Sequence, residues 1–249
     1  MERLRVDKLL ANMGIGTRSE IKRAVKQGKV SVDGKMIKDS GLIVHPEEQI
    51  ISYEGEEVRY QAWIYLMMNK PPGVLSATED ERDRTVIDLL ASNDRVLSPF
   101  PVGRLDKDTV GLLLLTNDGQ LAHELLSPRK HVDKLYEARV HGEVGQADRD
   151  AFQAGVTLDD GYVTLPAELD VLENTLEDGE AYSSIRLTIR EGKFHQVKRM
   201  FEAVGKQVVH LKRIAMGPLQ LDSQLAEGEY RELDEAEVEL LRSHRGNRP

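Results

Sequence analysis

The chain has 249 residues, 40% of them hydrophobic, which suits one large domain or two modest ones. It contains no cysteine, so disulfides and thiolate metal sites are excluded. No apolar stretch approaches the roughly 20 residues of a membrane helix, and the first residues lack the apolar core of a signal peptide, so we expect a cytoplasmic protein that is not bound to a membrane.

The formal net charge of −9 is unevenly distributed along the chain. Residues 1–38 hold ten Lys and Arg against four Asp and Glu, and residues 186–213 hold eight against two. Acidic residues concentrate in segments 143–180 and 222–239. Two basic segments in an acidic protein indicate binding to nucleic acid, although each segment could also be an ordinary solvated face.

The first 59 residues predict a small module of two helices followed by a hairpin. Apolar residues at helical spacing predict the first helix within residues 5–14. Thr17 and Glu20 predict a capping box at the start of the second helix, which Gly28 ends. Alternation around Asp33 predicts the hairpin. One face of the second helix carries a stripe of four cations, at Arg18, Lys22, Lys26 and Lys29.

Residues 60–249 predict a larger domain in which strands and helices are mixed. The predicted strands are 62–70, 112–115, 134–142, 185–189 and 208–213, and the predicted helices are 86–91, 119–126, 194–204 and 234–241. Because no regular βαβ rhythm is present, we expect an α+β fold with a mainly antiparallel sheet. Residues 242–249 are expected to be a disordered tail.

The stretch GRLDKDTVGLLLLTNDG, residues 103–119, places several charged side chains directly before an apolar run. Nearby positive charge keeps a carboxylate ionised. An ionised carboxylate held rigidly at the end of a strand can attack an electrophilic carbon or remove a proton. Asp106 and Asp108 are therefore candidate reactive groups, with a loop of internal ion pairs as the alternative.

Other side chains allow both a structural and a functional interpretation. Tyr136 lies in a predicted strand and could pack in the sheet or stack on an unpaired base. Lys198 and Arg199 fall on the outward face of the helix at 194–204, where they could be solvated or could contact phosphates. His195 is expected to face RNA or to pack. Since no metal-binding or nucleotide-binding pattern is found, we expect neither a metal nor a cofactor.

Four motifs resemble the catalytic segments of the small-subunit (RsuA-like) rRNA pseudouridine synthases. They are NKPPG, GRLDKDTVGLLLLTNDG, KLYEARV and REGKFHQVKRMFEAVG, in that order along the chain. The N-terminal module resembles the RNA-binding domain first recognised in a small-subunit ribosomal protein. The resemblance covers nearly the whole chain. It implies an RNA-binding module at 1–59 and a catalytic domain with a central cleft at 60–249.

Enzymes of this family detach uracil from the ribose and rejoin it through carbon five, without metal or cofactor. The resemblance implies that Asp106 does the chemistry, either as a nucleophile or as a base toward the ribose. Tyr136 would stack on the uracil, and Lys198 would pair with the catalytic carboxylate. Relatives commonly have Arg at that last position, so bidentate pairing is not assumed. Arg104 would help to extract the base, and further RNA contacts are expected from Arg18, Lys22, Lys26, Lys29, His195 and Arg199.

The expected substrate is small-subunit (16S) ribosomal RNA, free or in an assembling small-subunit particle, because HQVKRMF and SPRKH resemble the small-subunit enzymes. We expect a monomer. The alternatives are the same reaction on large-subunit RNA, or a non-catalytic RNA-binding assembly factor, against which the presence of all the matching catalytic residues counts. A carboxylate-pair glycosidase would need an acid partner for Asp106, and Asp108 is too close in sequence for that role.

Overall fold

The computed structural model describes residues 3–244 and divides the chain into two compact units. The first comprises Met1–Ile64 with Leu90–Pro99, and the second comprises Tyr65–Leu89 with Phe100–Pro249. The first unit therefore extends past the expected boundary at residue 59 and includes a short segment from later in the chain. No helix in the described part of the chain is long and apolar enough to cross a membrane.

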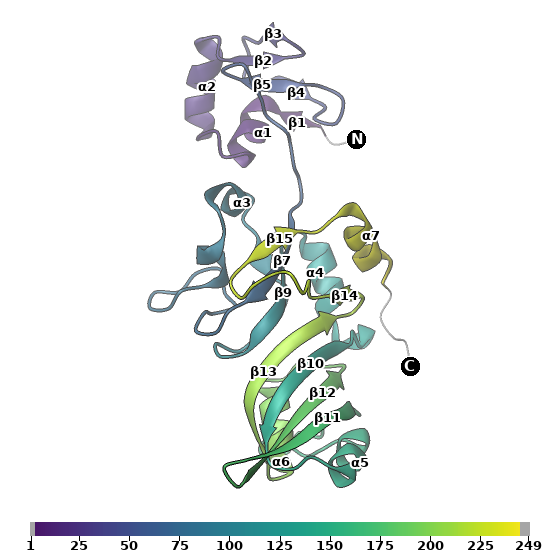
Figure 1. Ribbon diagram of the computed structural model, residues 1–249. Coiled ribbons are helices and arrows are strands. Elements are labelled where there is room, and N and C mark those ends of the chain that lie inside the picture. The colour runs from purple at the N-terminus through teal and green to yellow at the C-terminus, as the bar shows by residue number, and fades with distance from the viewer. Residues whose placement is uncertain (1–2, 245–249) are drawn as a thin grey trace. The chain divides into compact units, whose positions relative to one another are not determined.

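The first unit contains the expected two helices and hairpin (Figure 1). Its elements are β1 (Leu4–Arg5), α1 (Val6–Asn12), α2 (Arg18–Lys26), β2 (Val30–Val32), β3 (Lys35–Met36), β4 (Ile43–Val44), β5 (Ile51–Tyr53), β6 (Glu56–Glu57) and α3 (Ser92–Val96). Thr17 caps α2 through the predicted capping box with Glu20. The hairpin turn between β2 and β3 has positive φ at Asp33 and Gly34, as a tight two-residue turn requires.

The second unit is built on one nine-stranded sheet, seven strands of which run in the order β11-β12-β10-β13-β9-β7-β15. The seven are β7 (Tyr65–Lys70), β9 (Val110–Thr116), β10 (Lys134–His141), β11 (Glu168–Glu177), β12 (Glu180–Ile189), β13 (Gln207–Met216) and β15 (Tyr230–Glu232). The short strands β8 (Phe100–Pro101) and β14 (Leu219–Gln220) pair with β9 and β13. Neighbouring strands are antiparallel except β9 and β13, so the sheet is mainly antiparallel, as predicted.

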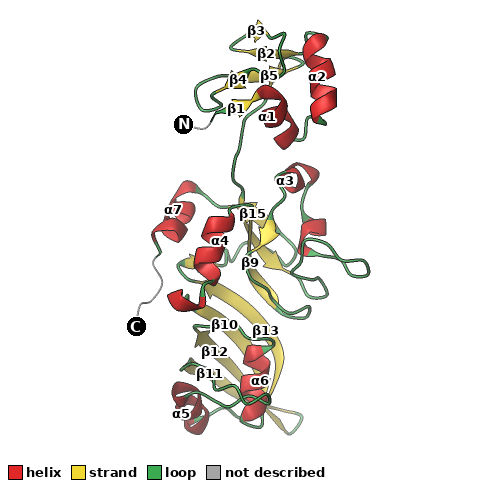
Figure 2. Cartoon of the chain, turned by 180° about the vertical axis from the view of Figure 1, so that it is seen from behind, coloured by secondary structure: helices red, strands yellow, loops and turns green. Residues whose placement is uncertain are grey.

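Helices flank both ends of this sheet (Figures 1 and 2). They are α4 (Gly119–Leu126), α5 (Gln146–Ala154), α6 (Gln196–Ala203) and α7 (Glu235–Ser243), with 3₁₀ turns at Val86–Leu89 and Pro128–Lys130. Leu121 and Leu125 of α4 and Leu241 of α7 pack into a core with β7 and β9. At the other end Phe152 of α5 meets Phe201 of α6 edge to face, with ring centroids 5.0 Å apart.

Several elements differ from the predicted set. The acidic segment forms α5 and β11, and α3 is also additional. The helix expected at 86–91 is a 3₁₀ turn at Val86–Leu89. The expectation of disorder from residue 242 is wrong for Arg242 and Ser243, since α7 continues to Ser243 and Arg242 donates a hydrogen bond to the Tyr65 hydroxyl. Residues 245–249 of that tail lie outside the described residues.

Candidate active site

A buried lysine lies beneath the charged loop that precedes β9. Lys70, the last residue of β7, is fully buried. Its Nζ donates to the carbonyl oxygens of Pro71 and Thr109 at 3.0 Å and of Lys107 at 3.3 Å. Burial lowers the pKa of Lys70 to about 8, against the opposing attraction of the carboxylates of Asp108 and Asp106. The cation thus ties the end of β7 to the backbone around Asp106.

Further hydrogen bonds fix the same loop from its other side. The Leu105 N–H donates to the Ser76 hydroxyl at 3.1 Å, and that hydroxyl donates to the Leu105 carbonyl at 3.0 Å. Within the loop, the Thr109 N–H donates to the Asp106 carbonyl at 3.1 Å. Because the backbone on both sides of Asp106 is bonded to buried groups, the part of the loop that carries its carboxylate is held in one place.

Strand β9 approaches β13 at a position that only glycine can occupy. Gly111 has φ of +101°, and a Cβ atom there would lie 2.3 Å from the carbonyl oxygen of Arg213. This close approach allows the parallel pairing of Gly111 with Arg213 and of Val110 with Lys212. The pairing brings the start of β9, and therefore the Asp106 loop, beside the central strands of the sheet.

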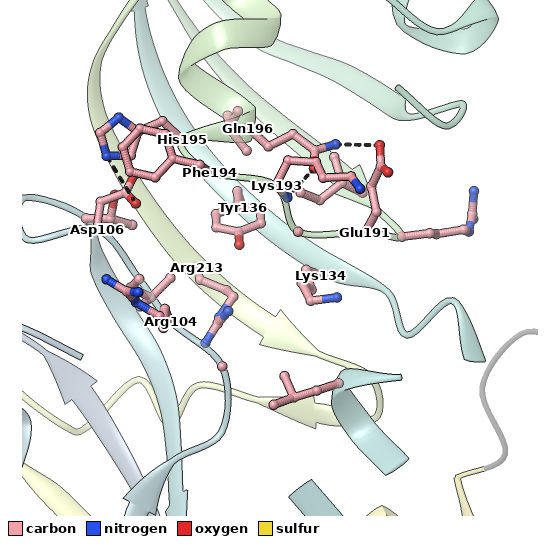
Figure 3. A pocket seen from close by; sticks show the side chains of 18 of the residues that line it. Arg104, Asp106, Lys134, Tyr136, Glu191, Lys193, Phe194, His195, Gln196 and Arg213 are labelled. Atoms are coloured by element: carbon pink, nitrogen blue, oxygen red, sulfur yellow. Dashed lines mark hydrogen bonds and ion pairs between the residues drawn. The ribbon is translucent and has the colours of Figure 1, made fainter. Parts of the chain in front are cut away.

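Asp106 lies at the edge of a cavity of about 770 Å³ (Figure 3). Its side chain is 26% exposed, so the carboxylate can be reached from the cavity. Two cationic or potentially cationic groups face it. His195 Nε2 lies 3.6 Å from one carboxylate oxygen, and Lys198 Nζ lies 3.7 Å from the other. Both distances exceed those of a direct hydrogen bond, so the contacts are electrostatic and leave the oxygens open.

Lys198 makes its direct contacts with the second aspartate of the loop. Its Nζ lies 2.6 and 2.8 Å from the two carboxylate oxygens of Asp108. This hydrogen bonding lowers the pKa of Asp108 despite an opposing effect of burial. From the sequence, Lys198 is expected to pair with the catalytic carboxylate. In the structure, Lys198 is shared between two carboxylates and is closer to Asp108 than to Asp106.

Tyr136 and Arg104 line the same cavity as Asp106. Tyr136 lies in the middle of β10, is 7% exposed, and faces Leu187 of β12 and Arg213 of β13 across the ladder. Figure 3 shows its hydroxyl directed into the space between Asp106 and Lys134. Arg104 is exposed and forms no ion pair with any residue in the described part of the chain. With His195, the fold thus brings four of the predicted site residues to one cavity.

An exposed aromatic side chain lies at the rim of the cavity. Phe194 is 75% exposed, and its ring stacks on that of His195 with centroids 3.7 Å apart and planes 19° apart. His195 precedes α6 in the left-handed conformation, with φ of +48°. The helix predicted to start at residue 194 therefore starts at Gln196, and this pair belongs to the preceding loop.

Arg199 points to a different part of the unit. It forms ion pairs with Asp159 and with Asp160, the latter at 2.7 Å, and does not line the cavity. Other cations of the basic segment 186–213 are similarly engaged. The pairs are Arg186 with Glu137, Arg190 with Asp133 and Glu168, and Lys206 with Asp148. Much of this basic segment is therefore neutralised within the protein, which its local charge does not reveal.

Comparisons with known proteins agree on one family. The family model described as RNA pseudouridylate synthase matches residues 64–203, and the S4 domain model matches residues 4–50. The chain is 53% identical to "Uncharacterized RNA pseudouridine synthase YtzG" of Bacillus subtilis, over 96% of this chain and 98% of that protein. The chain belongs to the RNA pseudouridylate synthase family. Enzymes of this family isomerise uridine in RNA and need no cofactor.

Relatives with assigned targets divide between the two ribosomal subunits. "Ribosomal large subunit pseudouridine synthase B" of Bacillus subtilis is 39% identical, over 98% of this chain and 96% of that protein. "Ribosomal small subunit pseudouridine synthase A" of Escherichia coli is 38% identical, over 94% of this chain and 98% of that protein. A crystal structure of a pseudouridylate synthase, 36% identical, superposes with a TM-score of 0.65 over 96% of this chain and 99% of that chain. The family, the fold and the S4 module expected from the motifs are confirmed.

In this pseudouridine synthase the S4 module presents only part of the predicted cationic stripe. Arg18 contacts Asp7 at 3.2 Å, and Lys29 contacts Glu54 at 2.6 Å. Lys22 and Lys26 are exposed and form no ion pair with the residues that the structure describes. The middle of the stripe is therefore the part that is available to phosphates.

Some residues of the synthase cavity are absent from the predicted site. They are Lys134, Glu191, Phe194 and Arg213. Lys134 could have been found, because a residue two positions before Tyr136 shares its face of a strand. Glu191 accepts hydrogen bonds from the Tyr162 hydroxyl at 2.6 Å and from Gln196 at 2.8 Å. No pattern in the sequence points to that set of contacts.

Proposed function

We propose that this protein converts a specific uridine of small-subunit ribosomal RNA to pseudouridine, with Asp106 as the catalytic carboxylate. One observation carries the proposal. The carboxylate of Asp106 opens into a cavity that also holds Tyr136, and His195 and Lys198 lie within 4 Å of it. A charged oxygen, an aromatic face and cations that favour the charged state are the groups that cofactor-free cleavage at a sugar carbon requires.

The cavity suits a single nucleotide turned out of an RNA helix. A uridine in a stacked helix cannot reach Asp106, so the nucleotide must flip at a cost of a few kcal/mol. Stacking of the uracil on Tyr136 offsets part of this cost, since stacking on an aromatic side chain contributes about 1–3 kcal/mol. Arg104, which lines the cavity, is proposed to help extract the base from its stack, and Phe194 is proposed to offer its exposed ring to a neighbouring base.

The reaction is an isomerisation in which atoms and charge balance within the nucleotide. The bond between C1′ of the ribose and N1 of uracil breaks, the ring turns, and C5 bonds to C1′. The proton on C5 is lost, and N1 gains one. An anionic Asp106 serves the first step either by attacking the ribose or by removing a proton from it. Its oxygens are free for both roles because neither His195 nor Lys198 bonds them directly.

Small-subunit RNA is the proposed target because the segments HQVKRMF and SPRKH resemble enzymes of that type. Large-subunit RNA is the second candidate, since a large-subunit synthase is as similar to this chain as a small-subunit one. A ribosomal RNA substrate, free or in an assembling particle, supports a cytoplasmic location. We propose that the enzyme acts as a monomer, because the cavity is formed by residues of one chain.

The proposal is tested by mapping pseudouridines in ribosomal RNA from cells with and without this protein. Cells that carry Asp106→Asn serve as the matched control. We expect one position of small-subunit RNA to remain uridine in both the deletion and the Asp106→Asn cells. A position missing from large-subunit RNA would replace the proposed target by the second candidate. Identical maps in all strains would contradict the proposed function.

A further inference from the structure

Two cations lie at the floor of the cavity without an anionic partner. Arg213 is 2% exposed; its Nε donates to the Leu112 carbonyl at 2.9 Å, and its Nη2 is buried without a hydrogen-bond partner. Lys134 donates to the Val132 carbonyl at 3.1 Å. Among the described residues, no carboxylate lies within ion-pair distance of either cation.

Such a pair is costly for the folded protein. A buried charge loses its hydration, and this loss is balanced only when a counter-charge or a full set of hydrogen bonds replaces the water. Burial, together with the neighbouring charge of Arg213, lowers the pKa of Lys134 to about 8 against the attraction of Asp133 and Glu191. Uncompensated groups of this kind concentrate at functional sites. The missing anion is therefore expected to be supplied by the substrate.

The position of the two cations indicates which part of the substrate they meet. Arg213 pairs directly with Tyr136 across β10 and β13, and Lys134 lies two residues before Tyr136 on the same face of β10. All three line the cavity. In Figure 3, Lys134 and Asp106 lie on opposite sides of Tyr136. A ring stacked on Tyr136 would therefore have the carboxylate on its sugar side and Lys134 toward its other edge, with Arg213 beside the ring.

We infer that Lys134 and Arg213 stabilise the uracil anion that leaves the ribose, by facing its carbonyl oxygens. This inference rests on the proposed function. When the C1′–N1 bond breaks, its electron pair stays on N1 and spreads onto O2 and O4 of the ring. Fixed positive charge in a water-poor cavity stabilises such developing charge strongly. Asp106 acts at the sugar, and the two cations act on the leaving group.

The inference is tested with Lys134→Met and Arg213→Met, assayed under single turnover on the substrate RNA. Removing one preorganised charge contact to a developing anion lowers rates by about 100-fold, and we expect a loss of this size in each variant. Arg213→Lys and Lys134→Arg keep the charge and should retain more activity. Arg139→Met is the matched control. It lies on β10, is exposed and pairs with Glu177, so we expect the wild-type rate.

A second substrate distinguishes leaving-group stabilisation from a structural role. The same RNA is prepared with 5-fluorouridine at the target, since fluorine makes the uracil a better leaving group. The readout is loss of N1-linked 5-fluorouridine from nuclease digests. We expect the deficit of the Met variants to shrink to less than about tenfold, because the better leaving group depends less on the cations. Melting temperatures of all variants verify folding.

The possible outcomes separate this inference from the proposed function. A wild-type enzyme that modifies no ribosomal RNA would overturn both. An active wild type whose Met variants keep full activity, or lose equally on uridine and 5-fluorouridine, would overturn the leaving-group role alone. A Met variant that fails to fold is replaced by its charge-retaining counterpart. For that variant too, an equal loss of rate on uridine and 5-fluorouridine counts against the leaving-group role.

Discussion

Lys134 illustrates how the surroundings of one side chain decide its chemistry. Burial is the main reason that its pKa falls to about 8, and Arg213 of β13 adds to the effect. Asp133 beside it and Glu191 after β12 act in the opposite direction without restoring the usual pKa. Lys70 beneath the Asp106 loop also has a pKa of about 8 because of burial. These two lowered pKa values make the free energy of unfolding vary with pH in the alkaline range.

The direction of that dependence follows from proton binding. Between pH of about 8 and 10.5, the unfolded chain holds protons on both lysines that the folded protein has lost, so the free energy of unfolding rises with pH. Lys134→Met removes one of the two contributions. We expect this variant to gain stability relative to wild type below pH 8 and to lose that gain toward pH 10.5. Urea unfolding at pH 7, 9 and 10.5 measures it, and a difference constant over this range would contradict the account.

At the residue scale, a side chain can be predicted to lie in the site when it belongs to a recognisable motif. Asp106 and Tyr136 are predicted because each belongs to a run of residues with a recognisable pattern, and the fold places both in one cavity. Arg213 is not predicted, because nothing in the sequence LKR indicates whether its arginine is solvated or buried. Arg199 looks available for RNA in the sequence, but Asp159 and Asp160 engage it in the structure.

At the scale of elements, the pairing of β9 with β13 depends on Gly111. The parallel contact places the backbone of Arg213 where a Cβ on residue 111 would be, at 2.3 Å, so the strands can meet only if that Cβ is absent. The φ of +101° adds a conformational cost for any other residue. The close approach of β9 to β13 at Gly111 thus places the loop before β9, which contains Asp106, beside the strand that carries Arg213.

Gly111→Ala should therefore destabilise the protein by about 3 kcal/mol or more, since the clash is with backbone that cannot move alone. Gly179→Ala is the control. Gly179 has a similar φ of +86°, but no atom lies within 4 Å of its would-be Cβ, so we expect a loss of about 1 kcal/mol. Chemical denaturation of the two variants measures both values. Equal losses would show that the close approach of the strands does not matter.

Elements with local signals are predictable, and elements without them are not. The capping box of Thr17 and Glu20 and the alternation of β10 are both found as expected. Helix α5 buries Phe152 as its one large apolar side chain, so its sequence has no apolar stripe. Strand β11 is largely exposed and rich in Asp and Glu, which are unfavourable in strands, and it is fixed by its ladder with β12.

At the scale of the whole molecule, ion pairing between segments decides which cations can bind RNA, more than the net charge of each segment does. The segments 143–180 and 186–213 carry opposite charge and combine in ion pairs such as Lys206 with Asp148 and Arg190 with Glu168. Only tertiary structure shows which cations this leaves available. In the S4 module the available ones include Lys22 and Lys26, while Arg18 and Lys29 contact carboxylates.

This distinction predicts how RNA affinity responds to salt. Each phosphate contact by a cation releases counterions, and each lost contact reduces the slope of log affinity against log salt by about 0.7 for single-stranded RNA. The double variant Lys22→Gln with Lys26→Gln should reduce the slope by about 1.4. The matched double variant Arg18→Gln with Lys29→Gln should reduce it less. Filter binding at several salt concentrations compares them, and equal slopes in both variants would contradict the assignment.

We propose that the carboxylate of Asp106, and not that of its neighbour Asp108, performs the chemistry. The most direct measurement compares Asp106→Asn with Asp108→Asn in pseudouridine formation on the substrate RNA. Loss of a covalent or proton-transfer group costs at least about 10³-fold in rate, so Asp106→Asn should be inactive at this level while its RNA affinity stays within about threefold. Asp108→Asn should retain activity within about tenfold, because Lys198 still faces Asp106. Turnover by Asp106→Asn comparable to wild type, or a larger loss from Asp108→Asn, would contradict the account.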